Sequence, residues 1–130
     1  MEKEGEINIL LVDDEEDFAN TLAERLRQRS YRVELAFDGR QALELIAQRS
    51  FEVILLDMNL PGLHGLEVLR RIRKTAPAAQ VIVITGYGSQ LVKSAAMLSG
   101  AFEFLQKPLD FRALIKSIRQ AAMARFQKKE

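Results

Sequence analysis

Short apolar runs alternate along the chain with segments in which apolar residues recur every three or four positions. The runs have the length of buried strands, and the segments have the spacing of amphipathic helices. The runs predict strands at residues 7–12, 32–36, 53–57, 81–85 and 102–105. The segments predict a helix after each strand, with core-facing residues that include Phe18, Leu22 and Leu26, then Ala42, Leu45 and Ile46, then Leu66, Leu69 and Ile72, then Leu91, Ala95 and Leu98, and finally Phe111, Leu114, Ile115, Ile118 and Ala122.

This alternation of strand and helix predicts an α/β fold with a doubly wound, five-stranded parallel sheet and five helices. The runs Val53–Leu56 and Val81–Ile84 are continuously apolar, as expected of strands that helices cover on both faces. With 130 residues and 48% hydrophobic content, the chain fits a single domain over residues 1–130. We expect its core at about 7–126 and a polar tail at 127–130.

The fourth predicted helix carries apolar residues beyond those assigned to its core-facing stripe. These additional residues are Val92, Ala96 and Met97. They would make the outer side of the helix unusually apolar, and exposed apolar area of this kind often marks an interface. Gly100 is expected to end the helix as a C-cap.

Polar residues of chemical interest lie at the carboxyl ends of four of the predicted strands. Asp13 and Asp14 follow the first strand, Asp57 ends the third, Thr85 ends the fourth and Lys107 comes just after the fifth. The functional crevice of such a sheet lies outside the carboxyl ends of its strands, so we expect these side chains to gather there. Clustered carboxylates repel one another, and a divalent cation relieves that cost; an all-oxygen site with spare water positions suits Mg²⁺. This set of groups is suited to moving a phosphoryl group, a reaction that depends on positioning and charge neutralisation.

The composition narrows the classes of function. The 19 basic and 18 acidic side chains nearly cancel to a net charge of +1. The net charge therefore gives no indication of binding to nucleic acid or to an anionic membrane. The absence of cysteine excludes disulfides, thiolate metal sites and cysteine nucleophiles. No apolar stretch approaches the ~18 residues of a membrane span, and residues 1–6 lack the apolar core of a signal peptide, so we expect a cytoplasmic protein. The lone His64 has no second histidine with which to form a metal pair, and we expect it to be an exposed bystander.

Each strand-end residue also has a purely structural explanation. Asp57 could be a turn residue, Thr85 could simply end a β-rich run, and Lys107 could be an ordinary solvated lysine. Their occurrence together at successive strand ends favours the functional interpretation. For the acidic run at residues 15–17, by contrast, we prefer the structural one, because acidic side chains stabilise a helix N-terminus.

Four segments resemble the receiver domain of two-component response regulators. They are Leu10–Glu15, Leu55–Gly62 with Gly65, Ile84–Gly86 and Gly100–Pro108. Each segment alone is a weak signal, but their order and spacing together make a strong one. The resemblance implies a flavodoxin-like fold of the receiver type and a phosphorylation-activated signalling switch, with no turnover of an external substrate.

The resemblance implies a role for each residue that would touch the phosphoryl group. Asp57 would attack as a carboxylate and form an acyl phosphate. Thr85 would hydrogen-bond one phosphoryl oxygen, and Lys107 would pair with another as a point charge. Phe104 occupies the position of the switch aromatic, which changes rotamer when Thr85 moves.

The resemblance also implies the metal ligands and the residues that set the lifetime of the phosphorylated state. Asp13, Asp14 and Asp57, together with the backbone carbonyl of Asn59, would hold Mg²⁺. The side chains of Asn59 and Tyr87 would admit or exclude the water that hydrolyses the acyl phosphate.

The partners follow from the same resemblance. A sensor histidine kinase or phosphotransfer protein would supply the phosphoryl group. Phosphorylation would change the surface formed by the fourth helix, the fifth strand and the fifth helix, which would control an output partner or domain. A phosphorylation-dependent homodimer through this surface is one form of that control. We expect no direct contact with nucleic acid or a membrane.

Three rival interpretations fit less well. A phosphatase of the haloacid dehalogenase type carries its nucleophile on the first strand, with a second aspartate two residues on, whereas Asn59 stands two residues after Asp57. A flavodoxin would need a hydroxyl- and glycine-rich phosphate loop after the first strand, where this chain has the acidic residues 13–17. A degenerate receiver used only for protein contacts would normally have lost one of the strand-end groups, and this chain has them all.

Overall fold

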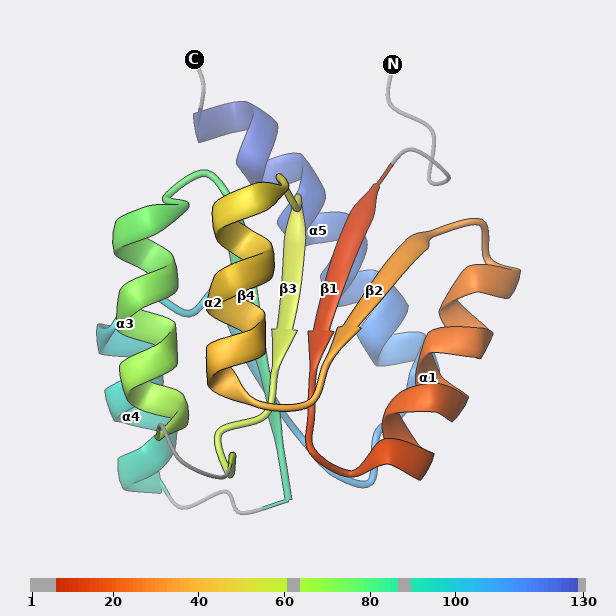
Figure 1. The fold of residues 1–130 in the computed structure, drawn as a ribbon, viewed down its shortest axis with the longest axis horizontal. Coiled ribbons are helices and arrows are strands. Elements are labelled where there is room, and N and C mark those ends of the chain that lie inside the picture. Colours follow the sequence, from red (N-terminus) through yellow and green to blue (C-terminus); the bar gives the residue numbers. More distant parts are fainter. Residues whose placement is uncertain (1–6, 61–63, 87–89, 129–130) are drawn as a thin grey trace.

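Five parallel strands form one sheet in the part of the chain that our computed structural model describes, residues 7–60, 64–86 and 90–128, with side chains to residue 124. The strands are β1 (Asn8–Val12), β2 (Arg32–Ala36), β3 (Val53–Leu56), β4 (Gln80–Thr85) and β5 (Glu103–Gln106), and the helices are α1 (Glu16–Gln28), α2 (Gly39–Gln48), α3 (Gly65–Thr75), α4 (Gln90–Leu98) and α5 (Phe111–Lys128). The strand order is β2-β1-β3-β4-β5, so the order reverses at β1 and β3 (Figure 1). The predicted fold class is confirmed.

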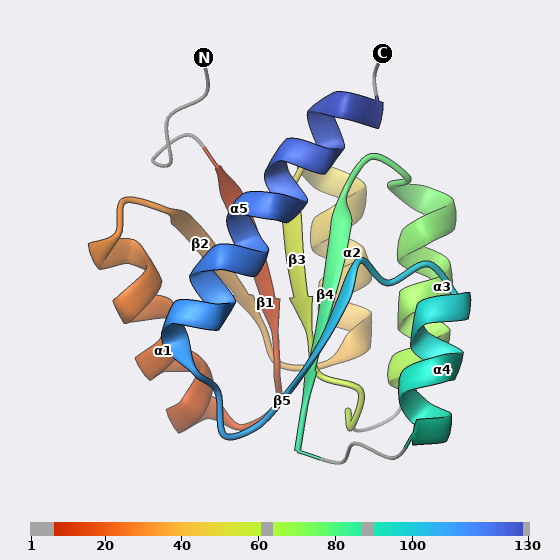
Figure 2. The same cartoon turned by 180° about the vertical axis from the view of Figure 1, so that it is seen from behind.

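The helices cover the sheet in two layers. The helices α1 and α5 pack on one face, and α2, α3 and α4 pack on the other, as the two opposite views show (Figures 1 and 2). Every residue of β3 and β4 is buried, because these strands lie inside the sheet and receive helices on both sides. Their continuous apolar sequence is therefore explained by their position.

Two helix ends follow from local side-chain and backbone chemistry. Asp38 is the N-cap of α2, and its side chain accepts a hydrogen bond of 2.8 Å from the Gln41 backbone N–H. Gly100 follows α4 with φ at +103°, a conformation that residues with a Cβ rarely adopt. Its N–H donates to the Met97 carbonyl at 3.1 Å, which confirms the predicted C-cap.

The predicted orientation of α4 is wrong. Ala96, predicted on the outer side, is fully buried. Leu91 and Leu98, predicted to face the core, are 82% and 89% exposed. Met97 is 41% exposed, as expected of the outer side. The helix is apolar around much of its circumference, so periodicity does not fix its rotation; the side that packs on the sheet carries the small Ala96. The outer side is still apolar, but mainly through the two leucines.

Candidate functional site: an acidic crevice at the carboxyl edge of the sheet

Backbone pairing brings the strand-end residues to one edge of the sheet. The backbone N–H of Asp57 donates to the Val12 carbonyl at 2.9 Å, which places the end of β3 beside the end of β1. On the other side of β3, the Lys107 N–H donates to the Thr85 carbonyl at 2.9 Å, which continues the pairing of β5 with β4. The strand order thus gathers the predicted residues at the crevice where such sheets bind ligands.

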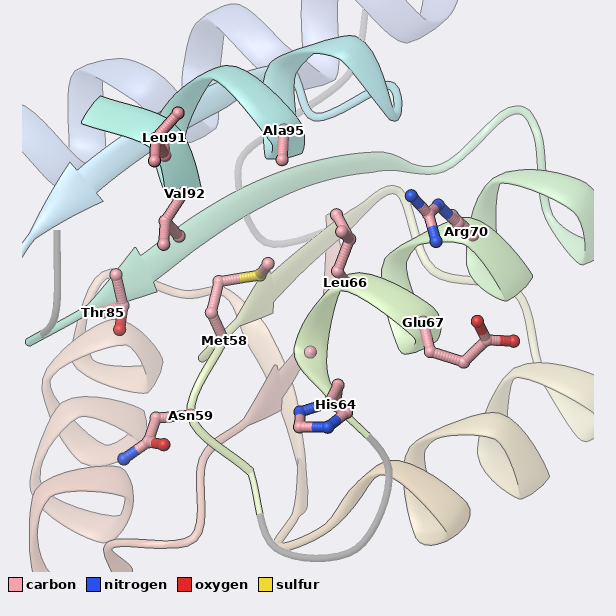
Figure 3. Close-up of a pocket in the computed structure, with 11 residues that line it drawn as sticks. Met58, Asn59, His64, Leu66, Glu67, Arg70, Thr85, Leu91, Val92 and Ala95 are labelled. Carbon is pink, nitrogen blue, oxygen red and sulfur yellow. The ribbon is translucent and has the colours of Figure 1, made fainter. Parts of the chain in front are cut away.

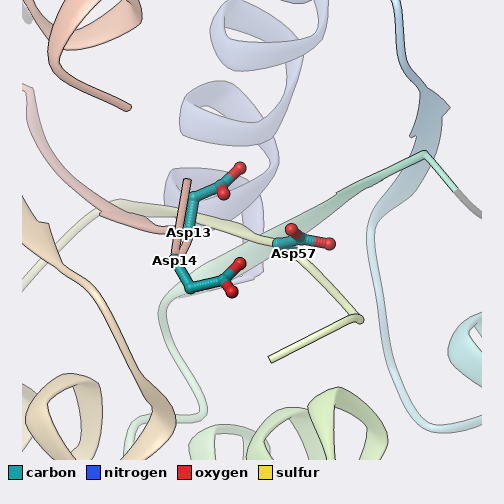
Figure 4. Close-up of side chains that lie close together, drawn as sticks. All are labelled: Asp13, Asp14 and Asp57. Carbon is teal, nitrogen blue, oxygen red and sulfur yellow. The ribbon is translucent and has the colours of Figure 1, made fainter. Parts of the chain in front are cut away.

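Three carboxylates form the centre of this edge. Asp13, Asp14 and Asp57 each offer one oxygen, and these oxygens all lie within 4.8 Å of one another (Figure 4). Asp13 and Asp57 are 1% and 4% exposed, whereas Asp14 is exposed to solvent. Hard oxygen donors on a half-open site fit Mg²⁺, which retains several water ligands and takes few from the protein. The residues therefore suit the metal that the sequence predicts.

Asp57 is a buried carboxylate whose pKa is shifted by its surroundings. Burial raises its pKa above the ordinary value of 3.8, and the nearby negative charge of Asp13 acts in the same direction. The backbone N–H of Asn59 opposes this shift, because it donates to Asp57 Oδ1 at 3.0 Å and favours the carboxylate. The group thus lies at the rim of the sheet, in an environment that disfavours its negative charge.

Lys107 supplies the positive charge of the crevice. Its Nζ lies 2.9 Å from Asp13 Oδ2 and 3.6 Å from Asp57 Oδ2. The Nζ also lies 4.2 Å from the centre of the Phe18 ring on α1, within the range of a cation–π contact. Burial alone would lower the pKa of Lys107, but hydrogen bonds to Glu15 and Asp13 outweigh burial, so its pKa is raised. The ammonium is therefore firmly charged.

Glu15 is a site residue that the sequence pattern does not reveal. Its Oε1 accepts a hydrogen bond of 2.6 Å from Lys107 Nζ, and it precedes α1 as the N-cap residue. The sequence explains the acidic run at 15–17 only as a favourable helix N-terminus, and Glu16 and Asp17 do form the first turn of α1. No pattern in the sequence pairs Glu15 with a lysine 92 positions away.

Thr85 and Phe104 lie on the α4 side of the crevice. Thr85 is fully buried and ends β4. Phe104 is partly buried and packs with the side chains between the sheet and α2, α3 and α4. Thr85 also lines a groove of about 550 Å³ between α3 and α4, together with Met58 and Val92 (Figure 3). A movement of Thr85 would therefore change the packing of the residues that support α4.

The remaining predicted residues lie around the loops. Asn59 is exposed, follows Asp57 by two positions, and lines the same groove as Thr85 (Figure 3). His64 is also exposed, as predicted, and precedes α3. Tyr87, together with Gly62 of the resembling segments, lies outside the described residues.

Among the helices that the structure describes, none is long and apolar enough to cross a membrane.

The sequence model of the "Response regulator receiver domain" family matches residues 9–119. The transcriptional regulatory protein YkoG of Bacillus subtilis is 39% identical over 114 residues, which cover 88% of this chain and 50% of that protein. The chain thus spans about half the length of this relative.

Two solved structures extend the comparison to three dimensions. A CheY-like receiver domain protein from Methanospirillum hungatei JF-1 superposes with a TM-score of 0.90 at 28% identity, over 94% of this chain and 98% of that one. A response regulator protein from Burkholderia pseudomallei, solved with a phosphorylated aspartic acid, calcium ion and citrate, gives a TM-score of 0.84 at 31% identity. That match covers 95% of this chain and 73% of the other.

Proposed function

The chain belongs to the response regulator receiver domain family, and from that premise we propose that Asp57 is the phosphoryl acceptor of its signalling switch. The observation that carries this assignment is the environment of Asp57. It lies at the rim of the sheet, within 4.8 Å of two further carboxylates and 3.6 Å from the Lys107 ammonium. The phosphorylated aspartic acid of the Burkholderia pseudomallei protein supports the same type of acceptor.

The proposed reaction uses the residues of the crevice in separate roles. A carboxylate oxygen of Asp57 attacks the phosphorus of the donor, an oxygen–phosphorus bond forms, and the bond from phosphorus to the leaving group breaks. Lys107 and Thr85 each hold one of the phosphoryl oxygens. Asp13, Asp14, Asp57 and the Asn59 carbonyl would hold Mg²⁺, which when bound supplies the positive charge that phosphoryl transfer requires. Phosphoryl transfer needs little covalent help from the protein, so positioning and charge neutralisation account for most of the catalysis.

The acceptor assignment is tested by phosphorylation with acetyl phosphate, a small donor that needs no partner protein. Wild-type protein should take up one phosphoryl group in the presence of Mg²⁺, and Asp57→Asn should take up none. Asp38→Asn is a matched control, because it makes the same change at a helix N-cap, where asparagine serves as well as aspartate. Labelling of Asp57→Asn at the wild-type level would overturn the assignment.

The family implies a histidine kinase as partner, and we infer that a sensor histidine kinase or a phosphotransfer protein is the donor for this chain. We further infer that the chain promotes only its own phosphorylation and dephosphorylation and turns over no external substrate. We infer that it works in the cytoplasm and binds neither nucleic acid nor a membrane directly. Residues 1–130 would form one domain with its core at about 7–126.

We infer that the output surface comprises α4, β5 and α5. Closure of Thr85 on a phosphoryl group would withdraw it from the groove beside α4, and Phe104 would move inward to fill that space. The outer side of α4 presents Leu91, Met97 and Leu98, an apolar area of the kind that marks interfaces. We therefore propose a phosphorylation-dependent homodimer or partner contact on this surface. Asn59 and Tyr87 are proposed to set how long the phosphorylated state lasts.

A further inference from the structure

Lys107 is shared unequally among three carboxylates. Its shortest contact is to Glu15 at 2.6 Å, followed by Asp13 at 2.9 Å, and its distance to Asp57 is 3.6 Å. An ammonium has three donor hydrogens, and the contacts to Glu15 and Asp13 are within hydrogen-bonding distance, whereas 3.6 Å exceeds that distance. The lysine is thus bound mainly on the α1 side of the crevice, away from the proposed phosphoryl acceptor.

Glu15 differs from Asp13 in its freedom to release the lysine. The Asp13 side chain is only 2% exposed, whereas the Glu15 side chain is 63% exposed and can exchange its partner for water. The Glu15 backbone is held in place, because its N–H donates to Asp13 Oδ1 at 2.9 Å and its carbonyl accepts from the Ala19 N–H at 2.9 Å. Only the side chain of Glu15 therefore needs to move for the contact to break.

We propose that Glu15 is a positioning residue that holds Lys107 in the unphosphorylated protein and competes with the phosphoryl group for it. This inference rests on the proposed function, in which Lys107 pairs with a phosphoryl oxygen. A phosphoryl group on Asp57 would carry more negative charge than the glutamate, so Lys107 would leave Glu15 and close on the new group. The contact between Glu15 and Lys107 lowers the free energy of the unphosphorylated protein. It therefore makes phosphorylation less favourable than it would be without Glu15.

The expected effect is set by the strength of a partly exposed ion pair. Glu15→Gln removes the competing charge and leaves the rest of the helix N-terminus in place. Pairs of this kind contribute modestly, so we expect beryllofluoride, a mimic of the phosphoryl group, to bind Glu15→Gln about two- to fivefold more tightly than wild type. The initial rate of phosphorylation by acetyl phosphate should rise by a similar factor.

A neighbouring residue provides a matched control. Glu16→Gln makes the same chemical change one position along the chain, at an exposed glutamate in the first turn of α1. It removes one negative charge near the crevice but leaves the hydrogen bond between Glu15 and Lys107 in place. Beryllofluoride affinity should be measured by titration calorimetry at fixed Mg²⁺, and Mg²⁺ affinity should be measured separately. We expect Glu15→Gln to alter Mg²⁺ affinity no more than Glu16→Gln does.

A double-mutant cycle with Lys107→Met isolates the contact itself. If Glu15 acts through Lys107, then Glu15→Gln should tighten beryllofluoride binding in the wild-type background and have no more effect than Glu16→Gln in the Lys107→Met background. Equal effects of Glu15→Gln and Glu16→Gln in the wild-type background would overturn the inference, as would weaker binding by Glu15→Gln. A failure of the proposed function is distinguishable, because Asp57→Asn would then still be phosphorylated by acetyl phosphate.

Discussion

Gly65 approaches the backbone of Met58 so closely that a Cβ on Gly65 would lie 2.4 Å from the Met58 Cα. The Gly65 N–H also donates to the Met58 carbonyl at 3.2 Å. This contact fastens the start of α3 to the residue directly after Asp57. The beginning of α3 therefore requires a residue without a side chain. With any larger residue, the segment that follows the proposed phosphoryl acceptor could not keep its backbone path.

Gly65→Ala should therefore destabilise the protein. The added methyl group meets backbone atoms that cannot rotate away, and overpacking of this kind costs about 1–3 kcal/mol in the free energy of unfolding. Gly86→Ala is the control, because a Cβ there meets nothing within 4 Å. Urea unfolding of both variants measures the difference. Equal stabilities would show that the segment after β3 adjusts freely.

The ionisation of Asp57 should cost stability when no metal is bound. Because burial raises its pKa in the folded protein, the folded state binds a proton more readily than the unfolded state, and stability falls as the pH rises through the folded pKa. Asp57→Asn cannot ionise, so without metal it should unfold at a higher temperature than wild type near neutral pH. This advantage should shrink as the pH falls towards the ordinary value of 3.8, since wild-type Asp57 then becomes neutral.

Thermal unfolding in a metal chelator at several pH values would measure this dependence. A stability difference that stays constant over the whole range would show that it arises from packing or hydrogen bonding of the amide, and not from the charge of Asp57.

The sequence predicts those parts of the fold in which one local signal suffices. The continuous apolar runs of β3 and β4 identify strands buried on both faces. Each run ends on a polar residue, which must lie at the edge of the sheet because the strand ends there. Asp57 and Thr85 can therefore be assigned to the same edge from the order of residues alone. Parallel pairing of β1 with β3 then brings Asp13 to the same place.

The rotation of α4 could not be predicted, because several rotations bury a similar amount of apolar side chain. The structure buries the small Ala96 and exposes Leu91 and Leu98, so size alone is a misleading guide to the core. Which side of a helix that is apolar around much of its circumference faces the sheet depends on the space left by its neighbours, and that is a property of the tertiary structure.

The contact between Glu15 and Lys107 escapes prediction for a different reason. The two residues follow β1 and β5, which are separated in the sheet by β3 and β4. Strand order alone suggests distance between them, but the lysine side chain is long enough to cross the crevice. Local acidic patterning at a helix N-terminus also offers a sufficient explanation for Glu15.

If the three carboxylates hold Mg²⁺ as proposed, the stabilisation of the protein by Mg²⁺ should depend on Asp14. Without metal, Asp14→Ala should leave the fold intact or raise the melting temperature, because an exposed carboxylate that repels two buried ones is removed. With metal, wild type should gain stability as Mg²⁺ is added, by about 2.7 kcal/mol at a hundredfold excess over the dissociation constant. Asp14→Ala should gain less at every concentration. An equal gain in both proteins would show that Asp14 does not contribute to binding.

The apolar side of α4 should carry the phosphorylation-dependent contact that we propose. Leu98→Asp places a charge at a side chain that is 89% exposed, so it should leave folding and phosphorylation unchanged while preventing self-association of the beryllofluoride-treated protein. Met123→Asp is the control, because this exposed residue of α5 lines a groove that Arg29, at the end of α1, also lines, and so belongs to the side of α5 next to α1. Sedimentation velocity distinguishes the two variants. If wild-type mass does not change with beryllofluoride, the surface would serve a different partner and not a second copy.

The lifetime of the phosphorylated state should depend on the Asn59 side chain. The acyl phosphate that we propose on Asp57 would be lost when water attacks in line with the bond to Asp57. The exposed Asn59 amide, two residues beyond this proposed acceptor, can hydrogen-bond that water and hold it in position. Leucine has nearly the same shape but offers no hydrogen bond, so Asn59→Leu should slow autodephosphorylation several-fold, on the order of 1 kcal/mol in the barrier. Phosphate release after removal of acetyl phosphate measures this rate in both proteins. Faster loss in Asn59→Leu would show that the amide shields the phosphoryl group from water and does not guide the attack.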